Sequence, residues 1–324
     1  MANTTSSTTT SFYTAQYIGE YLTTGIGPKV KYCFFPKSLA EIKDAIDYIR
    51  ANALEYYVIG GGSNTLIDDT LDENRAVICL KDFTGIQALE NYNVRINAGT
   101  TLQEVIDYAQ SNNLVGVTGM NRIPGSVGGA VLGNAGAYGT EICQTVVSVT
   151  FLDLRDLSIQ TFDNEKCEFG YRDSYFKKNL QYLILDVVLG FKKVEDYTAE
   201  KSRYEEIALF RDAIYPKGYK SPGSVFKNFP VDTVPKSVLD NMKPEWLVHN
   251  KLSVGAVLQS LDSNGFQVGG VKMTDRHANI MVVIPPATFN NAETLVHTLQ
   301  FKAKEKYNLD IEPEIRLVTQ FRKL

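Results

Sequence analysis

The chain has 324 residues, enough for about two domains with a sizeable buried core. Hydrophobic residues make up 44% of the chain and charged residues 22%, proportions typical of a globular protein. The 33 Lys and Arg residues against 37 Asp and Glu residues give a net charge of −4, without the basic excess of a nucleic-acid-binding protein. No apolar run approaches the roughly 20 residues that cross a membrane. We therefore expect a protein that binds neither nucleic acid nor membrane.

The N-terminus and the cysteines predict the cellular location. The Ser/Thr run over 4–11 has neither the charged start nor the apolar stretch of a signal peptide. The four cysteines, at positions 33, 79, 143 and 167, lie far apart and form no C-x-x-C pair. This spacing is typical of reduced thiols rather than of a disulfide framework or a zinc site. We therefore predict a cytoplasmic protein without a metal site.

Helices and strands alternate in the first part of the predicted fold. Residues 1–11 are expected to be a disordered tail, because a Ser/Thr run buries no apolar surface. Helices are predicted where Ser38 with Glu41, and Thr101 with Glu104, have capping-box spacing ahead of apolar residues at helical intervals. The strands expected in this part are 56–59, 76–80, 94–98, 146–154 and 182–191.

The composition becomes polar and charged from about residue 193, where we place a domain boundary. The elements expected beyond it are helices at 199–214, 255–263 and 292–307, strands at 278–284 and 311–319, and a loop over 215–228. Helices and strands mixed in this way predict an α+β protein. Its expected parts are the tail over 1–11, a first domain up to residue 192 and a C-terminal domain over 193–324.

Glycine is concentrated in two segments of the first domain. Gly60-Gly61-Gly62-Ser63-Asn64 follows a strand, so its backbone N–H groups can converge on a phosphate, although a tight turn explains the same residues. Eight glycines lie between Gly116 and Gly139, a density at which no regular helix is expected. Two such loops suit a flat, extended dinucleotide such as FAD. The lack of G-x-G-x-x-G argues against the usual Rossmann mode of binding it.

Three further segments carry polar groups, each with two interpretations. Arg172 is either a guanidinium that pairs with a substrate carboxylate or a surface arginine stacked on a tyrosine. Ser224 is either a functional hydroxyl or a structural serine, and no G-x-S-x-G elbow surrounds it. Strand alternation places Glu312, Glu314 and Arg316 on one face, either in a site or on an exposed edge with a Glu–Arg pair.

Taken together, these segments resemble the UDP-N-acetylenolpyruvoylglucosamine reductase (MurB) family. The resemblance runs from about Thr24 to Val318, and its most specific stretches are Ile59–Asn64, Ile123–Gly139, Gly170–Lys177, Gly223–Asn228 and Glu312–Arg316. The family implies a two-part FAD-binding α/β domain of the PCMH, or vanillyl-alcohol-oxidase, type over 12–70 and 71–192. A C-terminal α+β substrate-binding domain over 193–324 follows it.

The resemblance also implies an activity. NADPH, the co-substrate, reduces FAD, and the reduced flavin passes a hydride to the enolpyruvyl ether of a UDP-sugar, giving UDP-N-acetylmuramate for peptidoglycan synthesis. Arg172 matches the family's catalytic arginine, Ser224 its proton-donating serine and Glu314 its catalytic glutamate. The implied partners are these small molecules, and we expect the chain to be a monomer.

The binding residues are carried over from the family position by position. Those implied to bind the substrate are Tyr171, Lys227, Asn228 and His277. Those implied to bind the cofactor are Ile59, Gly60, Gly61, Gly62, Ser63, Asn64, Gly119, Ile123, Pro124, Gly125, Gly128, Gly129, Asn134, Gly136, Ala137, Tyr138 and Gly139. No His occurs in residues 1–248, so we expect the flavin to be bound non-covalently.

The chain departs from the family pattern in its C-terminal part, and two other functions stay open. Phe229 stands where the family usually runs directly from Lys-Asn to Pro, and Leu252–Leu258 replaces the usual Pro-Ala-Gly segment. An oxidase of the same flavin superfamily needs the FAD domain but neither Ser224 nor NADPH. A non-redox nucleotide-binding module needs only the glycine loops.

Overall fold

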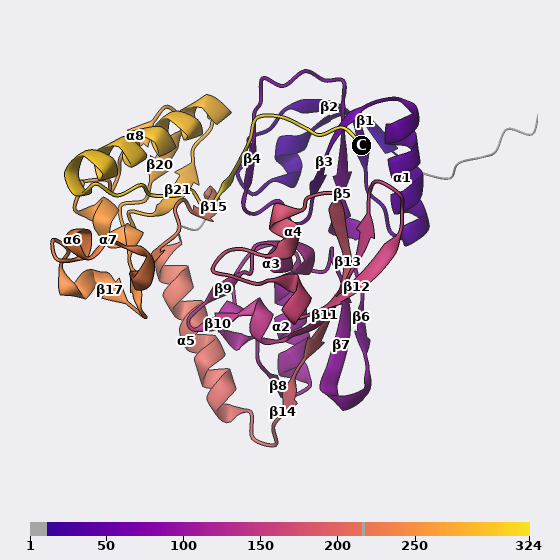
Figure 1. The fold of residues 1–324 in the computed structure, drawn as a ribbon, viewed down its shortest axis with the longest axis horizontal. Coiled ribbons are helices and arrows are strands. Elements are labelled where there is room, and N and C mark those ends of the chain that lie inside the picture. Colours follow the sequence, from indigo (N-terminus) through magenta and orange to yellow (C-terminus); the bar gives the residue numbers. More distant parts are fainter. Residues whose placement is uncertain (1–11, 216–217) are drawn as a thin grey trace, which may run out of the picture.

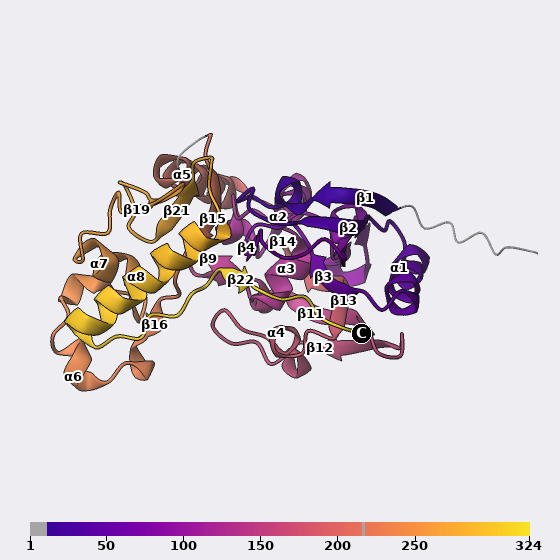
Figure 2. The same ribbon diagram turned by 90° about the horizontal axis from the view of Figure 1, so that it is seen from above.

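Two lobes of different topology make up this computed structural model, which describes residues 12–215 and 218–324. Figure 1 shows the larger lobe, built from the chain up to about residue 193, and helix α5 (Thr198–Ile214) leading to the smaller one. In Figure 2 the lobes lie next to each other along the long axis. The mixture of helices and strands confirms the predicted α+β class. The predicted tail over 1–11 lies outside the described residues, and none of the helices described is long and apolar enough to cross a bilayer.

A four-stranded sheet of mixed direction begins the larger lobe. Its strands, in spatial order, are β1 (Phe12–Tyr17), β2 (Lys29–Phe34), β5 (Arg75–Cys79) and β3 (Glu55–Ile59), of which β2, β5 and β3 are parallel. Helix α1 (Leu39–Ala51) begins after Ser38, whose hydroxyl accepts a hydrogen bond from the Glu41 N–H, as the capping spacing predicts. The glycine loop at 60–64 leaves β3 at its carboxyl end, the edge of a parallel sheet where ligands commonly bind.

Five antiparallel strands form the second sheet of this lobe. Their spatial order is β12 (Ile159–Asp163), β11 (Val146–Asp153), β13 (Tyr182–Gly190), β7 (Asn93–Asn97) and β6 (Ile86–Ala88). Thr101 and Glu104 form the predicted capping box of α2 (Leu102–Ser111), which buries its apolar face in the core of this lobe. Shorter elements are α4 (Tyr175–Lys178) and the strand pairs β8 (Leu114–Val115) with β14 (Lys192–Lys193) and β9 (Gly136–Ala137) with β10 (Thr140–Glu141).

The glycine-rich segment contains a helix, so the expectation that it holds none is wrong. Helix α3 (Val127–Leu132) forms despite the low helix propensity of its two glycines. The N–H groups of Val127 and Gly128 donate to the carbonyls of Thr100 and Ala98. A Cβ on Gly128 would lie 2.8 Å from the Ala98 Cβ, so glycine permits this close packing. Contacts from distant parts of the chain therefore outweigh local propensity.

The smaller lobe combines two sheets with one long helix. The larger sheet has the order β15 (Lys220–Ser224), β21 (Ile280–Val283), β20 (Val271–Met273) and β19 (Gln267–Val268), and α8 (Phe289–Tyr307) packs in the same core. The other elements are α6 (Lys236–Leu239), α7 (Val254–Gln259), and strands β16 (Phe229–Pro230), β18 (Lys251–Leu252) and β17 (Leu247–Val248). The prediction of a loop over 215–228 is wrong for Lys220–Ser224, which form strand β15. There a register shift between Lys220 and Gly223 accommodates Pro222, which has no N–H.

The end of the chain returns to the larger lobe. Strand β22 (Arg316–Val318) pairs in parallel with β4 (Thr65–Ile67). Beyond it, the buried ring of Phe321 lies 5.6 Å from that of Tyr57. Figure 1 shows this segment crossing from the smaller lobe to the larger one. The boundaries proposed at residues 70 and 192 stay predictions, and the last residues of the predicted C-terminal domain lie against the other lobe.

The last strand is shorter than the predicted 311–319. Pro313 has no N–H to donate, and the N–H groups of Glu314 and Ile315 both point to the carbonyl of Val225. The chain therefore bends at Glu314 before regular pairing begins at Arg316. The expected strand alternation of residues 312, 314 and 316 is wrong for this reason.

Replacing Phe321 by alanine is expected to lower the free energy of unfolding by about 3–5 kcal/mol, because a buried aromatic side chain is lost. Phe301→Ala is the matched control, since this ring on α8 is 66% exposed and its loss is expected to change stability by less than about 0.5 kcal/mol. Denaturant unfolding followed by circular dichroism measures both values. Equal effects would contradict the described anchoring of the C-terminal segment.

Candidate active site

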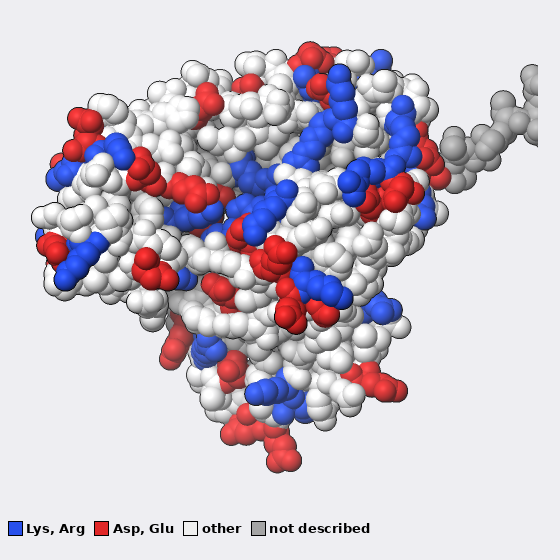
Figure 3. All heavy atoms as spheres, viewed as in Figure 1, with Lys and Arg blue, Asp and Glu red and all other residues white. Residues whose placement is uncertain are grey.

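A cavity of 590 Å³ is lined by residues of both lobes. Arg172 from the larger lobe, Ser224 at the end of β15 and Glu314 from the bend before β22 all face it. Figure 3 shows Lys and Arg side chains gathered near the middle of this face of the molecule, where the lobes meet. The three residues with open interpretations are therefore brought together from distant parts of the sequence.

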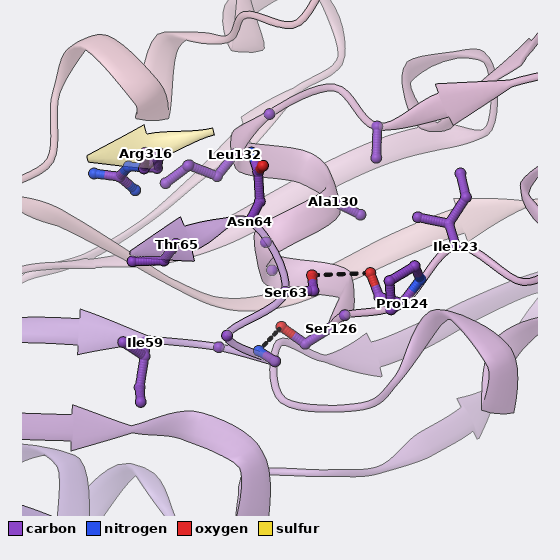
Figure 4. A pocket seen from close by; sticks show the side chains of 18 of the residues that line it. Ile59, Ser63, Asn64, Thr65, Ile123, Pro124, Ser126, Ala130, Leu132 and Arg316 are labelled. Atoms are coloured by element: carbon purple, nitrogen blue, oxygen red, sulfur yellow. Dashed lines mark hydrogen bonds between the residues drawn. The ribbon is translucent and has the colours of Figure 1, made fainter. Parts of the chain in front are cut away.

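The two glycine-rich loops pack directly on each other along one wall (Figure 4). The Ser63 hydroxyl donates to the Pro124 carbonyl at 3.0 Å, and the Gly61 N–H donates to the Ser126 hydroxyl at 3.2 Å. A Cβ on Gly61 would lie only 2.6 Å from the Cα of Gly125. Glycine is required here because any side chain would push the loops apart.

Backbone N–H groups of the first loop are available to a ligand. Within 12–215 and 218–324, no group accepts a hydrogen bond from the N–H of Gly62, Ser63 or Asn64. Successive N–H groups of this kind form a concave site that binds phosphate oxygens. Such a loop fits a pyrophosphate, and the wall that is poor in side chains fits a flat ring. The phosphate interpretation of this loop thus gains geometric support, although one glycine, Gly62, also has a turn conformation with φ +62°.

Arg172 and Glu314 form an ion pair at the cavity. Arg172 Nε donates to Glu314 Oε1 at 2.7 Å, and Arg172 Nη2 donates to the Gly136 carbonyl at 2.7 Å. Only 19% and 22% of the two side chains are exposed, so Arg172 is not a surface arginine. Its backbone has φ +54°, which is uncommon for a residue with a Cβ. Lys177 Nζ donates to the Arg172 carbonyl at 2.7 Å and helps to hold this conformation.

Burial and nearby charges act in opposite directions on Arg172. Burial lowers the pKa of Arg172, but Glu314 and Tyr171 raise it, and the resulting pKa lies above the ordinary value. The Tyr171 ring centre lies 5.2 Å from the guanidinium carbon and 3.9 Å from Lys251 Nζ. Arg172 therefore remains a cation at any pH at which the protein is folded, and can stabilise negative charge on a ligand.

Main-chain hydrogen bonds place Glu314 beside Ser224. The Glu314 N–H donates at 2.7 Å to the carbonyl of Val225, the residue after Ser224. The Asn64 side chain donates to the Glu314 carbonyl at 3.0 Å, which joins this bend to the first glycine loop. Among the residues that the structure describes, none hydrogen-bonds the Ser224 hydroxyl, so that group is available to a ligand.

Most of the predicted cofactor-binding residues line the cavity. They are Ile59, Gly60, Gly61, Gly62, Ser63, Asn64, Ile123, Pro124, Gly125, Gly128, Gly129, Gly136 and Ala137. Outside the lining lie Gly119, Asn134, Tyr138 and Gly139, as well as the predicted substrate-binding residues Tyr171, Lys227, Asn228 and His277. Asn134 still contacts the site, because its carbonyl accepts from Arg172 Nη1 at 3.4 Å. The binding roles of all these residues stay predictions.

The predicted substrate-binding residues divide into two groups. The Asn228 N–H donates to the Tyr171 hydroxyl at 3.3 Å, so these two lie close to the Arg172 guanidinium. His277 hydrogen-bonds none of the other three within the described residues; its ring lies beside Gly255, and its Nδ1 accepts from the Asn279 N–H at 3.2 Å. Burial lowers the pKa of His277, so its ring is neutral at pH 7.

The two departures from the family pattern meet in space. Phe229 pairs with Leu252 where β16 and β18 run antiparallel. Asn228 Oδ1 accepts from the Val254 N–H at 3.0 Å, within the second departing segment. The two departing segments therefore lie side by side in the smaller lobe.

Sequence reasoning missed several cations of the cavity wall. Lys177, Arg211 and Arg322 line it, although none was given a role. Arg211 lies in a helix of mostly polar residues, and Arg322 lies near the end of the chain. Neither belongs to a motif, so only the folded chain reveals them.

Comparison with known proteins points to one family. A profile described as "FAD binding domain" matches residues 30–162, and one described as "UDP-N-acetylenolpyruvoylglucosamine reductase, C-terminal domain" matches residues 215–318. The chain is 30% identical to the UDP-N-acetylenolpyruvoylglucosamine reductase of Solibacter usitatus, over 85% of this chain and 86% of that protein. It is 32% identical to that of Leuconostoc mesenteroides, over 93% and 94%. The chain belongs to the UDP-N-acetylenolpyruvoylglucosamine reductase family.

A solved structure supports the same fold. The MurB of Thermus caldophilus superposes with a TM-score of 0.72 at 24% identity, over 95% of this chain and 98% of that one. The predicted family is thus confirmed, and with it the prediction of an oxidoreductase with an FAD-binding domain. The interpretation as a non-redox nucleotide-binding module is wrong, and the family is one of reductases rather than oxidases.

Gly61→Ala is expected to weaken FAD binding at least about tenfold, or ~1.4 kcal/mol, because the added Cβ separates the two loops. Titration of the apo-protein with FAD, followed by flavin fluorescence, measures the affinity. Gly170→Ala is the control, since a Cβ there would meet nothing closer than 3.7 Å. An unchanged affinity in Gly61→Ala would argue against a cofactor held by these loops.

Proposed function

We propose that the protein reduces the enolpyruvyl ether of UDP-N-acetylglucosamine enolpyruvate to UDP-N-acetylmuramate, a precursor of peptidoglycan, with NADPH as electron donor. The observation that carries this proposal is the convergence of Arg172, Ser224 and Glu314 on a cavity walled by the two glycine loops. Family membership supports the substrate class, because the relatives are named for this substrate.

The residues present fit FAD as the cofactor. The N–H groups at 62–64 suit its pyrophosphate, and the packed loops at 60–64 and 123–129 leave room for it in the cavity. When bound, the flavin supplies the hydride chemistry, taking a hydride from NADPH and giving it to the terminal alkene carbon. The absence of His from residues 1–248 favours non-covalent binding.

Arg172 has the charge and position to stabilise the substrate carboxylate. Addition of a hydride to the terminal alkene carbon places negative charge on the neighbouring carbon, and this charge spreads into the carboxylate. A preorganised donor aimed at such developing charge contributes roughly 3–4 kcal/mol. Glu314 binds Arg172 Nε and so fixes the orientation of the guanidinium before a substrate arrives.

Ser224 is proposed to deliver the proton that completes the reduction. The negatively charged carbon is basic enough to take a proton from a neutral hydroxyl, so Ser224 needs no lowered pKa. One hydride and one proton are then added across the double bond, and the Ser224 oxygen regains its proton from water. The Ser224 hydroxyl has no partner among the described side chains to compete with this transfer.

The proposal extends to the surroundings of the protein. Its partners are the UDP-sugar and NADPH, and residues 12–192 hold the cofactor while 193–324 contribute most of the substrate contacts. A net charge of −4 supports the proposal that it binds no nucleic acid. We propose a cytoplasmic monomer that acts in cell-wall synthesis.

Ser224→Ala is expected to leave flavin reduction by NADPH unchanged and to slow reoxidation by the UDP-sugar by roughly 10²–10⁴-fold, because only the second step needs the proton. Anaerobic stopped-flow absorbance separates the two steps. Ser237→Ala, which removes an exposed hydroxyl from α6, is the control. Normal turnover by Ser224→Ala would refute the assignment, and wild-type protein that the UDP-sugar does not reoxidise would refute the proposed function.

Glu314→Gln is expected to slow the same reoxidation step by roughly 10–100-fold, because an amide holds the Arg172 guanidinium less firmly than a carboxylate does. Glu305→Gln is the control, since that carboxylate is exposed on α8 and forms no ion pair within the described residues. Single-turnover rates at saturating substrate measure the effect. Equal rates in both variants would show that the ion pair has no part in catalysis.

A further inference from the structure

Arg211 is a buried cation without a counter-charge. It lies in the last turn of α5, is only 8% exposed and lines the cavity. Within the described ranges its Nε has no hydrogen-bond partner, and no carboxylate forms an ion pair with it. Burial of an unpaired charge destabilises a protein strongly. A group that binds in the cavity is therefore expected to compensate this charge.

Aromatic side chains fix the position of the Arg211 guanidinium without neutralising it. The guanidinium carbon lies 4.7 Å from the centre of the Tyr215 ring. Tyr138 is a second neighbour: burial raises the pKa of Tyr138, and the positive charge of Arg211 opposes that rise. The Tyr138 ring packs edge-on against Phe210, the residue before Arg211, with 5.8 Å between the ring centres.

Arg211 is connected to the proposed reaction centre through Tyr138. Its neighbour Tyr138 follows Gly136 and Ala137, and the Gly136 carbonyl accepts from Arg172 Nη2. The loop at 60–64, by contrast, contacts 124–126. This chain of contacts places Arg211 on the side of the cavity where Arg172 lies, so we assign it the reacting part of the cofactor.

We propose that Arg211 supplies the counter-charge for the flavin ring in its reduced form, an inference that rests on the proposed function. The oxidised ring is neutral. It gains one negative charge when it takes a hydride from NADPH, which leaves as NADP⁺. A fixed, unpaired cation stabilises the charged form more than the neutral form, so Arg211 raises the reduction potential of the bound flavin.

The test is the midpoint potential of bound FAD in wild-type protein and in Arg211→Met, measured by equilibration with a reference dye. Loss of the charge is expected to lower the equilibrium constant for reduction by about 10–100-fold, which is about 30–60 mV for a two-electron couple. Arg211→Gln, which keeps a polar group without the charge, is expected to give the same shift. Arg211→Lys is expected to restore most of the wild-type potential.

Arg203→Met is the matched control. It removes the same charge from the same helix, but Arg203 donates to the Tyr138 carbonyl at 3.0 Å and lies outside the cavity lining. Its potential is expected to equal that of the wild type. An equal shift in Arg203→Met, or unchanged potentials in Arg211→Met and Arg211→Gln, would overturn the proposal. The proposal would also be overturned if Arg211→Met weakened the binding of oxidised and reduced FAD equally. Such a result would show that Arg211 contacts the phosphates rather than the flavin ring.

Stability without cofactor gives a second readout that does not need FAD. Apo-protein carrying Arg211→Met is expected to melt at the same temperature as the wild type or higher, because an unpaired buried charge is removed. A lower melting temperature would show that Arg211 is already compensated in the empty protein, which contradicts the proposal. Neither readout uses the UDP-sugar. If the wild-type flavoprotein failed to reduce the UDP-sugar, the proposed function would be refuted. The midpoint potentials would still test whether Arg211 stabilises the reduced flavin.

Discussion

The parallel pairing of β22 with β4 decides where the functional groups of this protein meet. It brings the last part of the chain back to the first glycine loop, where the Arg316 N–H donates to the Asn64 carbonyl at 2.9 Å. The Asn64 side chain in turn holds the carbonyl of Glu314. Glu314 thereby reaches Arg172, a residue 142 positions earlier in the chain. The smaller lobe is held by the same bend, because the Glu314 N–H binds Val225 next to Ser224.

Glycine provides the second constraint, since the cofactor wall consists of backbone in contact with backbone. Gly61 packs on Gly125, and Gly128 packs on Ala98, at distances that leave no room for a Cβ. The same absence of side chains leaves the N–H groups of the first loop open to the cavity. Close packing and ligand access thus have one cause, and a substitution in either loop affects both.

Features encoded in neighbouring residues could be predicted from the sequence. The caps at Ser38 and Thr101 are of this kind, because each hydroxyl accepts from the N–H three residues later, and at Thr101 the Glu104 side chain completes a capping box. Features that depend on distant contacts could not. Helix α3 relies on carbonyls at 98 and 100, and β15 relies on pairing with β21.

The candidate site shows the same division. Arg172, Ser224 and Glu314 could be singled out as residues, and a family resemblance connected them, but each also fitted a structural role. The sequence around each of these residues does not predict that the three lie close together in the folded chain. Arg211 could not be found at all, because its position at the cavity depends on how α5 packs rather than on the residues around it.

Cations outnumber carboxylates in the cavity lining, although the whole chain has a net charge of −4. Lys177, Arg316 and Arg322 line it, and no carboxylate of the described chain forms an ion pair with any of them. Burial lowers the pKa of Lys177 and of Arg322, and a neighbouring cation lowers each further: Lys227 in the first case, Arg316 in the second. Like charges held this close destabilise the empty protein. Because an anionic ligand removes this repulsion only in the folded state, binding of a dinucleotide or of a nucleotide sugar stabilises the fold as well as filling the site.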